Sequence, residues 1–377
     1  MKKFIYLCGM MLLSLNMMAQ IDLNDPNWDT VFFDDFTTNR SWRTSDWYSI
    51  PDLYWKAHPG DHITHGKREG QIYQYDHCQF DLNEGVIKLV SEFDANDSIP
   101  AHHYDLPDCM HGEYPTDTTL FFFSGEIDVI SMNFRYGYFE IRCKLPLHRG
   151  SFPAFWLYGG GPSSYEEIDI FEYSKGDCDG DTLRGHSSGI WHNPFSSHCI
   201  DTINGTTAKN YAKTHHHLPS SSPDLSQYHT FGCEWMPEYV KWYRDGEVIA
   251  EYYDIDHIPQ YAKTLKVNYA ILNDYGLDSN HQPLGWSGSD VMTIDYVLVR
   301  NLNTDCETDE YITTGTQFAN HDNKMKHSIT IGSPNGQVIV PSNTNVFMHA
   351  EETIVINGEF EISNASQMSL LVHACPE

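Results

Sequence analysis

The sequence predicts an all-β protein, built as an antiparallel sandwich or barrel. Short segments rich in β-branched and aromatic residues recur along the chain, and many of them alternate between apolar and polar positions. Gly, Pro, Asp and Asn residues separate these segments, and no stretch keeps a sustained helical period, which favours packed sheets. The segments expected to form strands are residues 31–33, 86–90, 136–144, 239–243 and 292–299.

The connections between these segments are of two kinds. Arg244-Asp245-Gly246-Glu247 lies between two strand-like runs and predicts a tight hairpin, because Asp-Gly is a favoured turn dipeptide. Residues 91–120 and 174–228 form connections that are longer than ordinary loops. Connections of that length in a folded domain usually serve a function.

The N-terminus predicts export. Lys2 and Lys3 precede an apolar run at 4–15, and Ala19 follows it, which is the pattern of a cleavable signal peptide over 1–19. The alternative is an ordinary N-terminal helix. The run is shorter than the roughly 20 residues that span a bilayer. We therefore expect no transmembrane segment, and a mature protein in the periplasm, on the cell surface or outside the cell.

The rest of the chain divides near residues 301–315, where a polar, threonine-rich stretch interrupts the strand pattern. A large domain over 20–302 is followed by a small β module over 303–377, whose size is marginal for a domain that folds alone. The sequence assigns this module no role, and no internal repeat is evident. Its strands are expected at 346–348, 353–356 and 370–372.

The composition narrows the class of partner. The chain carries 52 acidic against 23 basic side chains, for a formal net charge of -29, which repels nucleic acids and other polyanions. A neutral polysaccharide is compatible with this charge, whereas a densely sulfated one would need a local basic pocket. Aromatic residues make up 14% of the chain, and their rings can stack on sugars as well as fill a core.

Cysteine usage fits an exported protein. Of the 9 cysteines, Cys8 lies in the expected signal peptide, and the even number that remains permits disulfides. Cys178 and Cys199 flank one polar loop and are the pair that we expect to be joined. No Cys/His spacing indicates zinc, and the histidine run at 215–217 is interpreted as a loop, because adjacent residues rarely converge on one ion.

Three acidic residues alternate with apolar ones in the run Glu167-Ile168-Asp169-Ile170-Phe171-Glu172. Positions i and i+2 of a strand share a face, so Glu167 and Asp169 point the same way. Glu172 falls on the opposite face unless one β-bulge near Ile170-Phe171 turns it back, and bulges often re-aim side chains at active sites. Carboxylates crowded on one face suit a glycosidase that pairs a nucleophile with a proton donor. The alternative is the solvated acidic face of an edge strand.

The flanking motifs decide between these interpretations. The segments 136–146, 152–157 and 167–172, the pair Glu234-Trp235 ahead of Trp242-Tyr243 and Asp245-Gly246, and the strand-like run at 295–299 together resemble glycoside hydrolase family 16. This family contains laminarinases, lichenases, agarases, porphyranases and carrageenases. The resemblance covers residues 28–302 and implies a β-jelly-roll sandwich of the concanavalin A type, with a substrate cleft on its concave face.

The resemblance also implies roles for individual residues. Glu167 corresponds to the nucleophile, Asp169 to its assisting acid and Glu172 to the general acid/base of a retaining mechanism. Core packing is the alternative for the two tryptophans in the expected substrate-binding set, and a structural role is the alternative for its histidine. That set consists of Trp156, Tyr165, His192, Trp235 and Asn268.

No cofactor is expected for catalysis. Many relatives hold a structural calcium on the convex face, using backbone oxygens and an aspartate of the last strand, which corresponds to Asp295 here; a hard cation suits such oxygen ligands. The resemblance thus implies a calcium site that serves stability, and we expect the protein to be a monomer.

The expected activity is endo-hydrolysis of a β-linked gluco- or galacto-polysaccharide with retention at the anomeric carbon. A β-1,3-glucan is the first choice, because residues 152–157 and 167–172 are most similar to those of laminarinases. A β-agarase, a porphyranase or another endo-β-galactanase on algal or host glycans is the alternative, and Arg184, His186 and His192 would suit it. A non-catalytic carbohydrate-binding protein would lack one of the three acids, and all three are present.

Overall fold

The computed structural model describes most of the large domain and of the C-terminal module. The described residues are 28–38, 48–49, 55–57, 59–62, 69–94, 99–100, 119–120, 122–129, 132–146, 148, 150–159, 165–175, 184–193, 202–203, 206–207, 224–253, 258–272, 288–302, 304–316, 318, 322–332, 336–342, 344–364 and 366–372. The expected signal peptide, Cys178, Cys199 and the histidine run at 215–217 lie outside them. Within these ranges no helix is long and apolar enough to cross a membrane.

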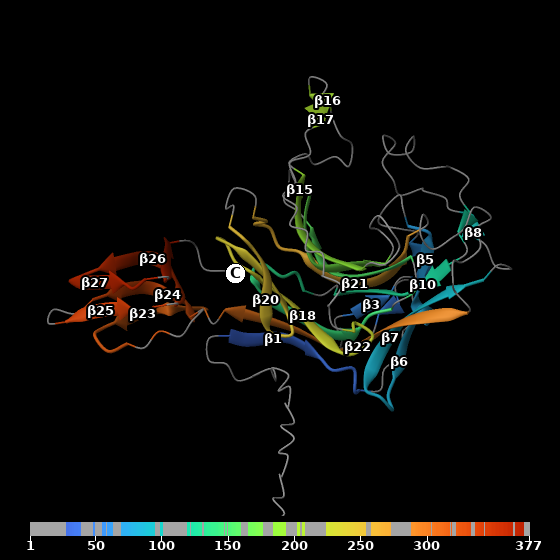
Figure 1. The fold of residues 1–377 in the computed structure, drawn as a ribbon, viewed down its shortest axis with the longest axis horizontal. Coiled ribbons are helices and arrows are strands. Elements are labelled where there is room, and N and C mark those ends of the chain that lie inside the picture. Colours follow the sequence, from blue (N-terminus) through green and yellow to red (C-terminus); the bar gives the residue numbers. More distant parts are fainter. Residues whose placement is uncertain are drawn as a thin grey trace, which may run out of the picture.

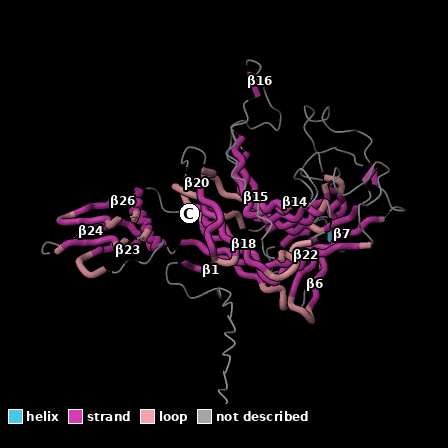
Figure 2. The backbone as a smooth tube through the Cα atoms, viewed as in Figure 1, coloured by secondary structure: helices cyan, strands magenta, loops and turns pink. Residues whose placement is uncertain are grey.

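Strands make up nearly all regular structure in these ranges (Figure 2). One sheet has eleven strands in the order β20-β19-β18-β12-β22-β7-β10-β5-β4, with β1 beside β22 and β6 beside β7. The 3-10 helix η1 (Tyr75–His77) joins β5 to β6. The strands are β1 (Trp28–Asp34), β4 (Pro59–His62), β5 (Gln71–Gln74), β6 (Cys78–Asp81), β7 (Val86–Phe93), β10 (Phe122–Ser124), β12 (Gly137–Lys144), β18 (His229–Trp235), β19 (Val240–Arg244), β20 (Glu247–Tyr252) and β22 (Ser289–Leu302).

The second sheet has seven strands in the order β15-β14-β13-β21-β11-β3-β2. It lies against the first sheet and curves so that its outer face is concave (Figure 1). Its strands are β2 (Tyr48–Ser49), β3 (Trp55–Ala57), β11 (Glu126–Val129), β13 (Ser151–Gly159), β14 (Tyr165–Lys175), β15 (Arg184–Asn193) and β21 (Thr264–Ile271). Two short ribbons stand apart from the sheets, β8 (Ile99–Pro100) with β9 (Thr119–Leu120), and β16 (Thr202–Ile203) with β17 (Thr206–Thr207).

The core lies between the two sheets, because the inward residues of both are apolar. Phe171 of β14 and Phe231 of β18 pack with ring centroids 4.7 Å apart, and both are fully buried. Neighbouring strands of the sandwich are antiparallel except for the parallel pair β5 and β10. The predicted all-β antiparallel sandwich is therefore confirmed.

The local predictions for the sandwich hold. The predicted segments 31–33, 86–90 and 292–299 lie within β1, β7 and β22. The segments 136–144 and 239–243 have all but their first residue in β12 and β19. The predicted hairpin joins β19 to β20, and Asp245 and Gly246 have φ angles of 50° and 80°. Positive φ at both central residues is the signature of the type I′ turn, whose twist matches that of the flanking strands.

The C-terminal module has an architecture that the sequence did not predict. It is a parallel solenoid with a four-stranded sheet, β23-β24-β26-β28, and a two-stranded sheet, β25-β27. From β24 onward, consecutive strands belong alternately to the first and the second of these sheets. Partners in the last turn lie 22 residues apart, as in Asn345 with Gln367 and Gln337 with Glu359. The strands are β23 (Thr304–Ile312), β24 (Asp322–Ile331), β25 (Gln337–Val340), β26 (Asn345–Ile356), β27 (Glu359–Ile362) and β28 (Gln367–Val372).

The sequence analysis did not detect this repeat, because the backbone positions repeat while the amino-acid types do not. The residues that fill equivalent places in successive turns differ in type, as Met348 opposite Leu370 and Ala350 opposite Val372 show. The two segments predicted as separate strands at 346–348 and 353–356 both belong to β26. A separate apolar core fills the solenoid, built from Ile329, Ile331, Val338, Val340 and neighbouring residues.

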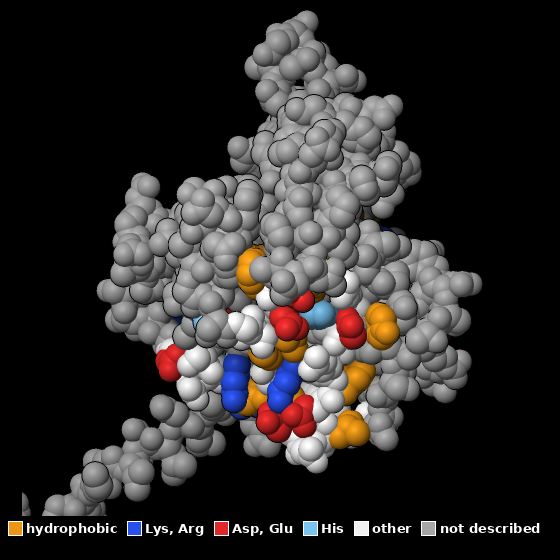
Figure 3. Space-filling model, turned by 90° about the vertical axis from the view of Figure 1, so that its right-hand side faces the viewer, with side chains coloured by type: hydrophobic (Ala, Val, Ile, Leu, Met, Phe, Trp, Pro, Cys, Tyr) orange, Lys and Arg blue, Asp and Glu red, His pale blue; other side chains and the backbone are white. Residues whose placement is uncertain are grey.

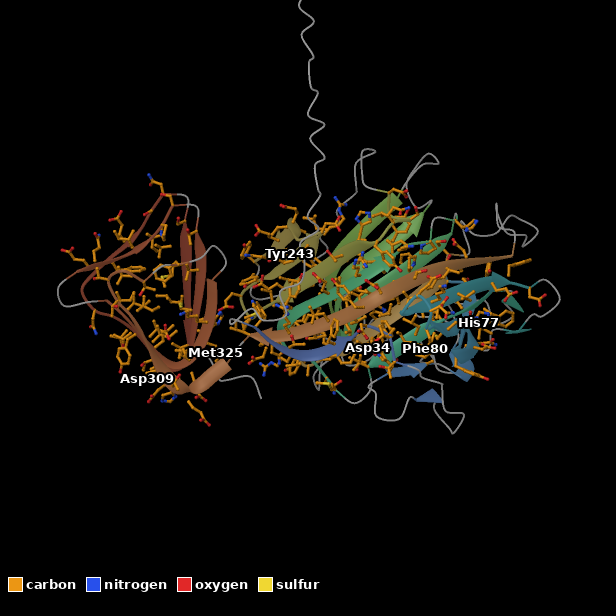
Figure 4. The ribbon with its side chains drawn as sticks, turned by 90° about the horizontal axis from the view of Figure 1, so that it is seen from below. Asp34, His77, Phe80, Tyr243, Asp309 and Met325 are labelled. Carbon is orange, nitrogen blue, oxygen red and sulfur yellow. The ribbon has the colours of Figure 1, made fainter. Side chains whose placement is uncertain are left out.

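The solenoid packs against one end of the sandwich. Met325 of β24 forms a small apolar cluster with Met236, Tyr239 and Leu302, and it lies on the side of the solenoid that faces the sandwich (Figure 4). A cavity of about 610 Å³ opens at this junction. Among the described cysteines, Cys306 is disulfide-bonded, whereas Cys78, Cys143 and Cys233 are free and buried.

Basic and acidic side chains are interspersed on the end of the sandwich seen in Figure 3. Lys88 pairs with Asp81 at 2.7 Å, and Arg142 pairs with Asp295. Both cations are therefore paired with an adjacent carboxylate.

Candidate active site

Strand β14 carries the three carboxylates that the sequence singles out. Opposite them on β13 stand Tyr158 beside Glu167, Trp156 beside Asp169 and Ala154 beside Glu172. Directly opposed residues of antiparallel strands share a face, and residues two apart on one strand do so as well. Because their three partners are alternate residues of β13, all three carboxylates lie on the outer face of the seven-stranded sheet. We call it the carboxylate face.

A β-bulge in β14 produces this arrangement. On the β13 side, Phe155 is opposite Phe171 and Trp156 opposite Asp169, which leaves Ile170 as an extra residue. On the β15 side, the register shifts between Asp169 and Glu172. The bulge predicted near Ile170-Phe171 is therefore confirmed. Both of these residues stay in the core, with 1% and 0% of their surface exposed.

The opposite sheet contributes a hydrogen bond to the bulge. The indole Nε1 of Trp242, on β19, donates to the backbone carbonyl oxygen of Asp169 at 2.8 Å. A bulge disrupts the ladder of main-chain hydrogen bonds around it, and a buried carbonyl needs a donor. Trp242 is fully buried, so it supports β14 from the core side and has no surface for substrate.

The start of β14 is held by a buried ion pair. Glu166 and Lys263 are 2% and 0% exposed, and their side chains meet at 2.8 Å. The same carboxylate oxygen accepts hydrogen bonds from the backbone N–H of Gln260 at 3.2 Å and of Tyr261 at 3.4 Å. Burial lowers the pKa of Lys263, and the negative charge of Glu166 opposes that shift. Because Glu166 adjoins Glu167, this pair sets the position of the expected nucleophile; the sequence did not reveal it.

Two of the expected substrate-binding residues meet on the carboxylate face. Trp156 Nε1 donates to Asn268 Oδ1 at 2.7 Å, and Asn268 Nδ2 donates to the Tyr73 hydroxyl at 2.8 Å. Trp156 is 7% exposed and Asn268 3%. Their polar groups are thus engaged with one another, and they form a rigid floor beside the carboxylates instead of a freely exposed stacking platform.

A lysine lies beside this floor. Lys266 of β21 is directly opposite Trp156 and so shares the carboxylate face. Its ammonium bonds Glu126 at 3.0 Å and Asp128 at 2.8 Å, both on β11. Burial disfavours the charged form, but the two carboxylates outweigh it and raise the pKa of Lys266. We call Lys266, Glu126 and Asp128 the lysine clamp; it carries two negative charges against one positive.

The sequence analysis did not identify the lysine clamp, although the sequence contains a pattern that points to it. Glu126-Ile127-Asp128 repeats the acid–apolar–acid pattern of Glu167-Ile168-Asp169. Thr264, Lys266 and Asn268 likewise alternate along β21. Two strands with polar residues at every second position predict further functional side chains on the same face.

Trp235 does not lie where the resemblance implied. It belongs to β18 of the eleven-stranded sheet and is fully buried between the sheets, where its ring packs against Tyr136 at 5.2 Å between centroids. Its Nε1 donates to the Pro259 carbonyl oxygen at 2.9 Å. A side chain in the core cannot stack on a sugar, so the core-packing alternative is correct for this residue.

The other two expected substrate-binding residues can be placed by their backbones only. Tyr165 is paired with Asn193, and His192 with Glu166, at the β14–β15 edge of the sheet. Their side chains lie outside the described set. Trp191, which the sequence analysis did not select, has its backbone opposite Glu167.

Asp295, which the resemblance implies as a calcium ligand, is paired with an arginine in the structure. The guanidinium of Arg142 donates to the Asp295 carboxylate, which is therefore already paired with a cation. In the described ranges no group of three or more His, Cys, Asp or Glu side chains could hold a metal ion. Calcium binds through several oxygen ligands at once, so a calcium ion at Asp295 would take its other ligands from backbone oxygens.

Comparisons with known proteins agree with this geometry. Residues 117–297 match the model of "Glycosyl hydrolases family 16". Two curated relatives come from Rhizobium meliloti (strain 1021): the endo-1,3-1,4-beta-glycanase EglC is 26% identical over 73% of this chain and 52% of its own length, and the endo-1,3-1,4-beta-glycanase ExsH is 30% identical over 45% and 31%. The chain thus spans about half or less of these relatives.

A solved structure supports the fold. The catalytic domain of an endo-1,3-beta-glucanase (laminarinase) from Thermotoga petrophila RKU-1 superimposes with a TM-score of 0.50 at 22% identity. The match covers 74% of this chain and 99% of that domain. The matched share leaves out about a quarter of the chain, as expected if the solenoid is an addition to the shared sandwich.

Proposed function

Because the chain belongs to glycoside hydrolase family 16, we propose that it hydrolyses internal β-linkages of a polysaccharide with retention at the anomeric carbon. The observation that carries this proposal is the bulge in β14, which brings Glu167, Asp169 and Glu172 onto one face. A strand without the bulge would turn Glu172 into the core. A bulge disrupts the regular main-chain hydrogen bonds of a sheet, and bulges are over-represented next to active sites.

Each of the three carboxylates has its own role in a double-displacement mechanism. Glu167 attacks the anomeric carbon while Glu172 gives its proton to the departing glycosidic oxygen, which leaves a covalent glycosyl–enzyme. Glu172 then removes a proton from water, and the hydroxide formed displaces Glu167 from the sugar. Asp169 lies between them in the strand and is only 2% exposed, a position from which it can hold the Glu167 carboxylate in place.

The lysine clamp supports a neutral substrate. Lys266 is a cation on the carboxylate face, and Glu126 and Asp128 compensate its charge twice over. A sulfate ester brought to this part of the face meets net negative charge added to that of the ionised catalytic carboxylates, which repels it. A neutral glucan or galactan meets no such penalty, and its hydroxyls can bond carboxylates and the ammonium alike.

Within neutral polysaccharides, a β-1,3-glucan is our first choice. The segments 152–157 and 167–172 are most similar to those of laminarinases, and the curated relatives are named as endo-1,3-1,4-beta-glycanases. An endo-β-galactanase on algal or host glycans is the second candidate, because Arg184 and His186 of β15 stand on the strand next to the catalytic one.

A substrate panel tests the proposal. The purified protein is incubated with laminarin, mixed-linkage glucan, agarose, porphyran, carrageenan and mucin-type glycans, and the products are sized. We expect short oligosaccharides from laminarin, with the β-anomer formed first by proton NMR. Glu167→Gln and Glu172→Gln should each abolish the release. Cleavage of a galactan alone would replace the glucan choice, and α-anomer first or near-normal activity in either variant would overturn the mechanism.

We also propose that the protein is exported. Lys2, Lys3, the apolar run at 4–15 and Ala19 support a signal peptide that is removed after residue 19. N-terminal sequencing of the protein from a cell that secretes it should begin at Gln20. An unprocessed N-terminus in the mature protein would contradict the proposal.

A further inference from the structure

The cavity between the sandwich and the solenoid has the size of a ligand site. Its volume of about 610 Å³ lies within the range of roughly 300–1,000 Å³ that small-molecule ligands occupy in proteins. Both parts of the chain line it, with Val31, Phe134 and Leu302 from the sandwich and Met325 and His349 from the solenoid. Domain interfaces are frequent places for such sites. We call it the junction cavity.

Much of the wall of the junction cavity is apolar and flexible. Met132 and Met236 of the sandwich line it together with Met325 of the solenoid, and Met325 lies on the side that faces the sandwich (Figure 4). Unbranched methionine side chains adapt to the shape of a ligand. A sugar would bury hydroxyl groups against this wall without hydrogen-bond partners, at a cost in free energy. The wall therefore suits a flexible apolar chain.

One cation stands at the rim of this apolar wall. Arg135 is an exposed lining residue, and its guanidinium carbon lies 5.1 Å from the centroid of the Tyr136 ring. Among the described residues, no carboxylate is paired with Arg135. Glu238 and His349 at the same junction face each other, with 3.3 Å between Oε1 and Nδ1. Arg135 can therefore receive the carboxylate of a ligand, and its planar guanidinium suits bidentate contact.

An unusual backbone conformation marks the same wall. Tyr136 has a φ angle of 62°, which is uncommon for a bulky residue other than glycine. Gly137 follows with a φ angle of 120°, and a β-carbon on it would lie 2.5 Å from the backbone oxygen of Arg300. Backbone strain of this kind clusters at ligand sites. The rim that carries Arg135 thus has a second feature that is typical of a binding site.

We propose that the junction cavity binds an amphipathic carboxylate, a small molecule with one carboxylate head and a flexible alkyl chain. The head pairs with the guanidinium of Arg135, and the chain fills the space between Met132, Met236 and Met325. A bound chain thereby touches both the sandwich and the solenoid. None of the described lining residues belongs to β14, so the proposal does not rest on the proposed hydrolysis.

Three ligands with the same alkyl chain test the proposal on the full-length protein. Decanoate, decanol and decylammonium are titrated into it, and binding is measured by calorimetry. The buffer is held at pH 6, because burial raises the pKa of Glu238 to about 7 and this carboxyl group then stays mostly protonated. We expect decanoate to bind at one site, and the other two ligands to bind more weakly by roughly tenfold or more.

Two variants and a control locate the site. Arg135→Met should weaken decanoate by roughly tenfold or more, because it removes a charge-assisted hydrogen bond. Ala262→Trp, which adds bulk to the wall, should weaken decanoate as well. Arg142→Met is the matched control: it removes the same charge near the other end of β12, outside the cavity, and should leave binding unchanged.

Four results would overturn the proposal. The first is the absence of decanoate binding, and the second is equal affinity for decanoate and decanol, which would mean that Arg135 selects no carboxylate. Equal weakening by Arg142→Met and Arg135→Met would mean general attraction to surface charge. Unchanged binding to Ala262→Trp would place decanoate elsewhere on the protein. Unchanged thermal unfolding of the three variants without ligand serves as the check on folding.

Discussion

The indole of Trp242 reaches across the core and donates a hydrogen bond of 2.8 Å to the backbone carbonyl of Asp169. The donor belongs to the eleven-stranded sheet and the acceptor to the seven-stranded sheet, at the bulge that aims the carboxylates. This contact couples the packing of the sandwich to the geometry of β14 and its three carboxylates. Trp55, on β3 of the seven-stranded sheet, donates a buried indole hydrogen bond of 2.9 Å to Asp34 Oδ2 and lies four strands away from β14.

Trp242→Phe should therefore reduce both stability and turnover. Removing one partner of a buried hydrogen bond costs about 1–3 kcal/mol, and the bulge loses its fixed carbonyl. Trp55→Phe is the control: it removes a buried indole hydrogen bond as well, so it should cost similar stability and leave kcat near that of the parent. Urea unfolding and laminarin hydrolysis, both at a temperature where each variant is folded, measure the two effects. Equal kcat in the two variants would refute the link between Trp242 and the geometry of β14.

The part of this arrangement that depends on neighbouring residues of one strand can be predicted from the sequence. The alternation of acids and apolar residues places Glu167 and Asp169 together, and the same period shows that Glu172 joins them only through a bulge. Contacts between strands that are distant in the chain cannot be predicted from such a local pattern. Lys266 meets Glu126 and Asp128 across 140 and 138 positions of the chain. The role expected for Trp235 came from the resemblance to the family, but its strand β18 joins the eleven-stranded sheet, where the side chain is buried in the core.

Lys263→Met should destabilise the protein strongly. It leaves Glu166 buried without its counter-charge, which costs about 3–5 kcal/mol when one partner of a buried pair is removed. Glu166→Gln with Lys263→Met together should recover a large part of the loss, because neither charge is then buried alone. Urea unfolding of both single variants and the double variant measures the coupling. Additive losses would show that the two residues act independently.

The net charge of the lysine clamp should determine how efficiently the protein hydrolyses a sulfated substrate. The double change Glu126→Gln and Asp128→Asn leaves Lys266 as an uncompensated cation near the substrate. Removal of two negative charges at roughly 10 Å is enough for about a tenfold change at an intermediate dielectric. We expect kcat/KM on sulfated laminarin, relative to laminarin, to rise by about that factor and the gain to shrink in high salt. An unchanged ratio would place the clamp outside the substrate's reach.

Glu238 should make stability fall as pH rises. It lies between β18 and β19 at the junction with the solenoid, its Oε1 is 3.3 Å from His349 Nδ1, and burial raises its pKa from 4.5 to about 7. Between these values the unfolded chain has an ionised Glu238 while the folded protein keeps it protonated. The folded state therefore binds more protons, and its stability declines across this window by up to roughly 3 kcal/mol.

Replacing Glu238 by glutamine should remove that decline. Glu238→Gln is expected to match the parent protein near pH 4.5 and to exceed its unfolding free energy at pH 8, because no buried charge has to form. Glu247→Gln, an exposed glutamate on β20, is the control and should change neither value. Urea unfolding at pH 4.5, 6 and 8 follows the difference. A gain for Glu238→Gln that is the same at every pH would mean that the effect comes from packing and not from ionisation.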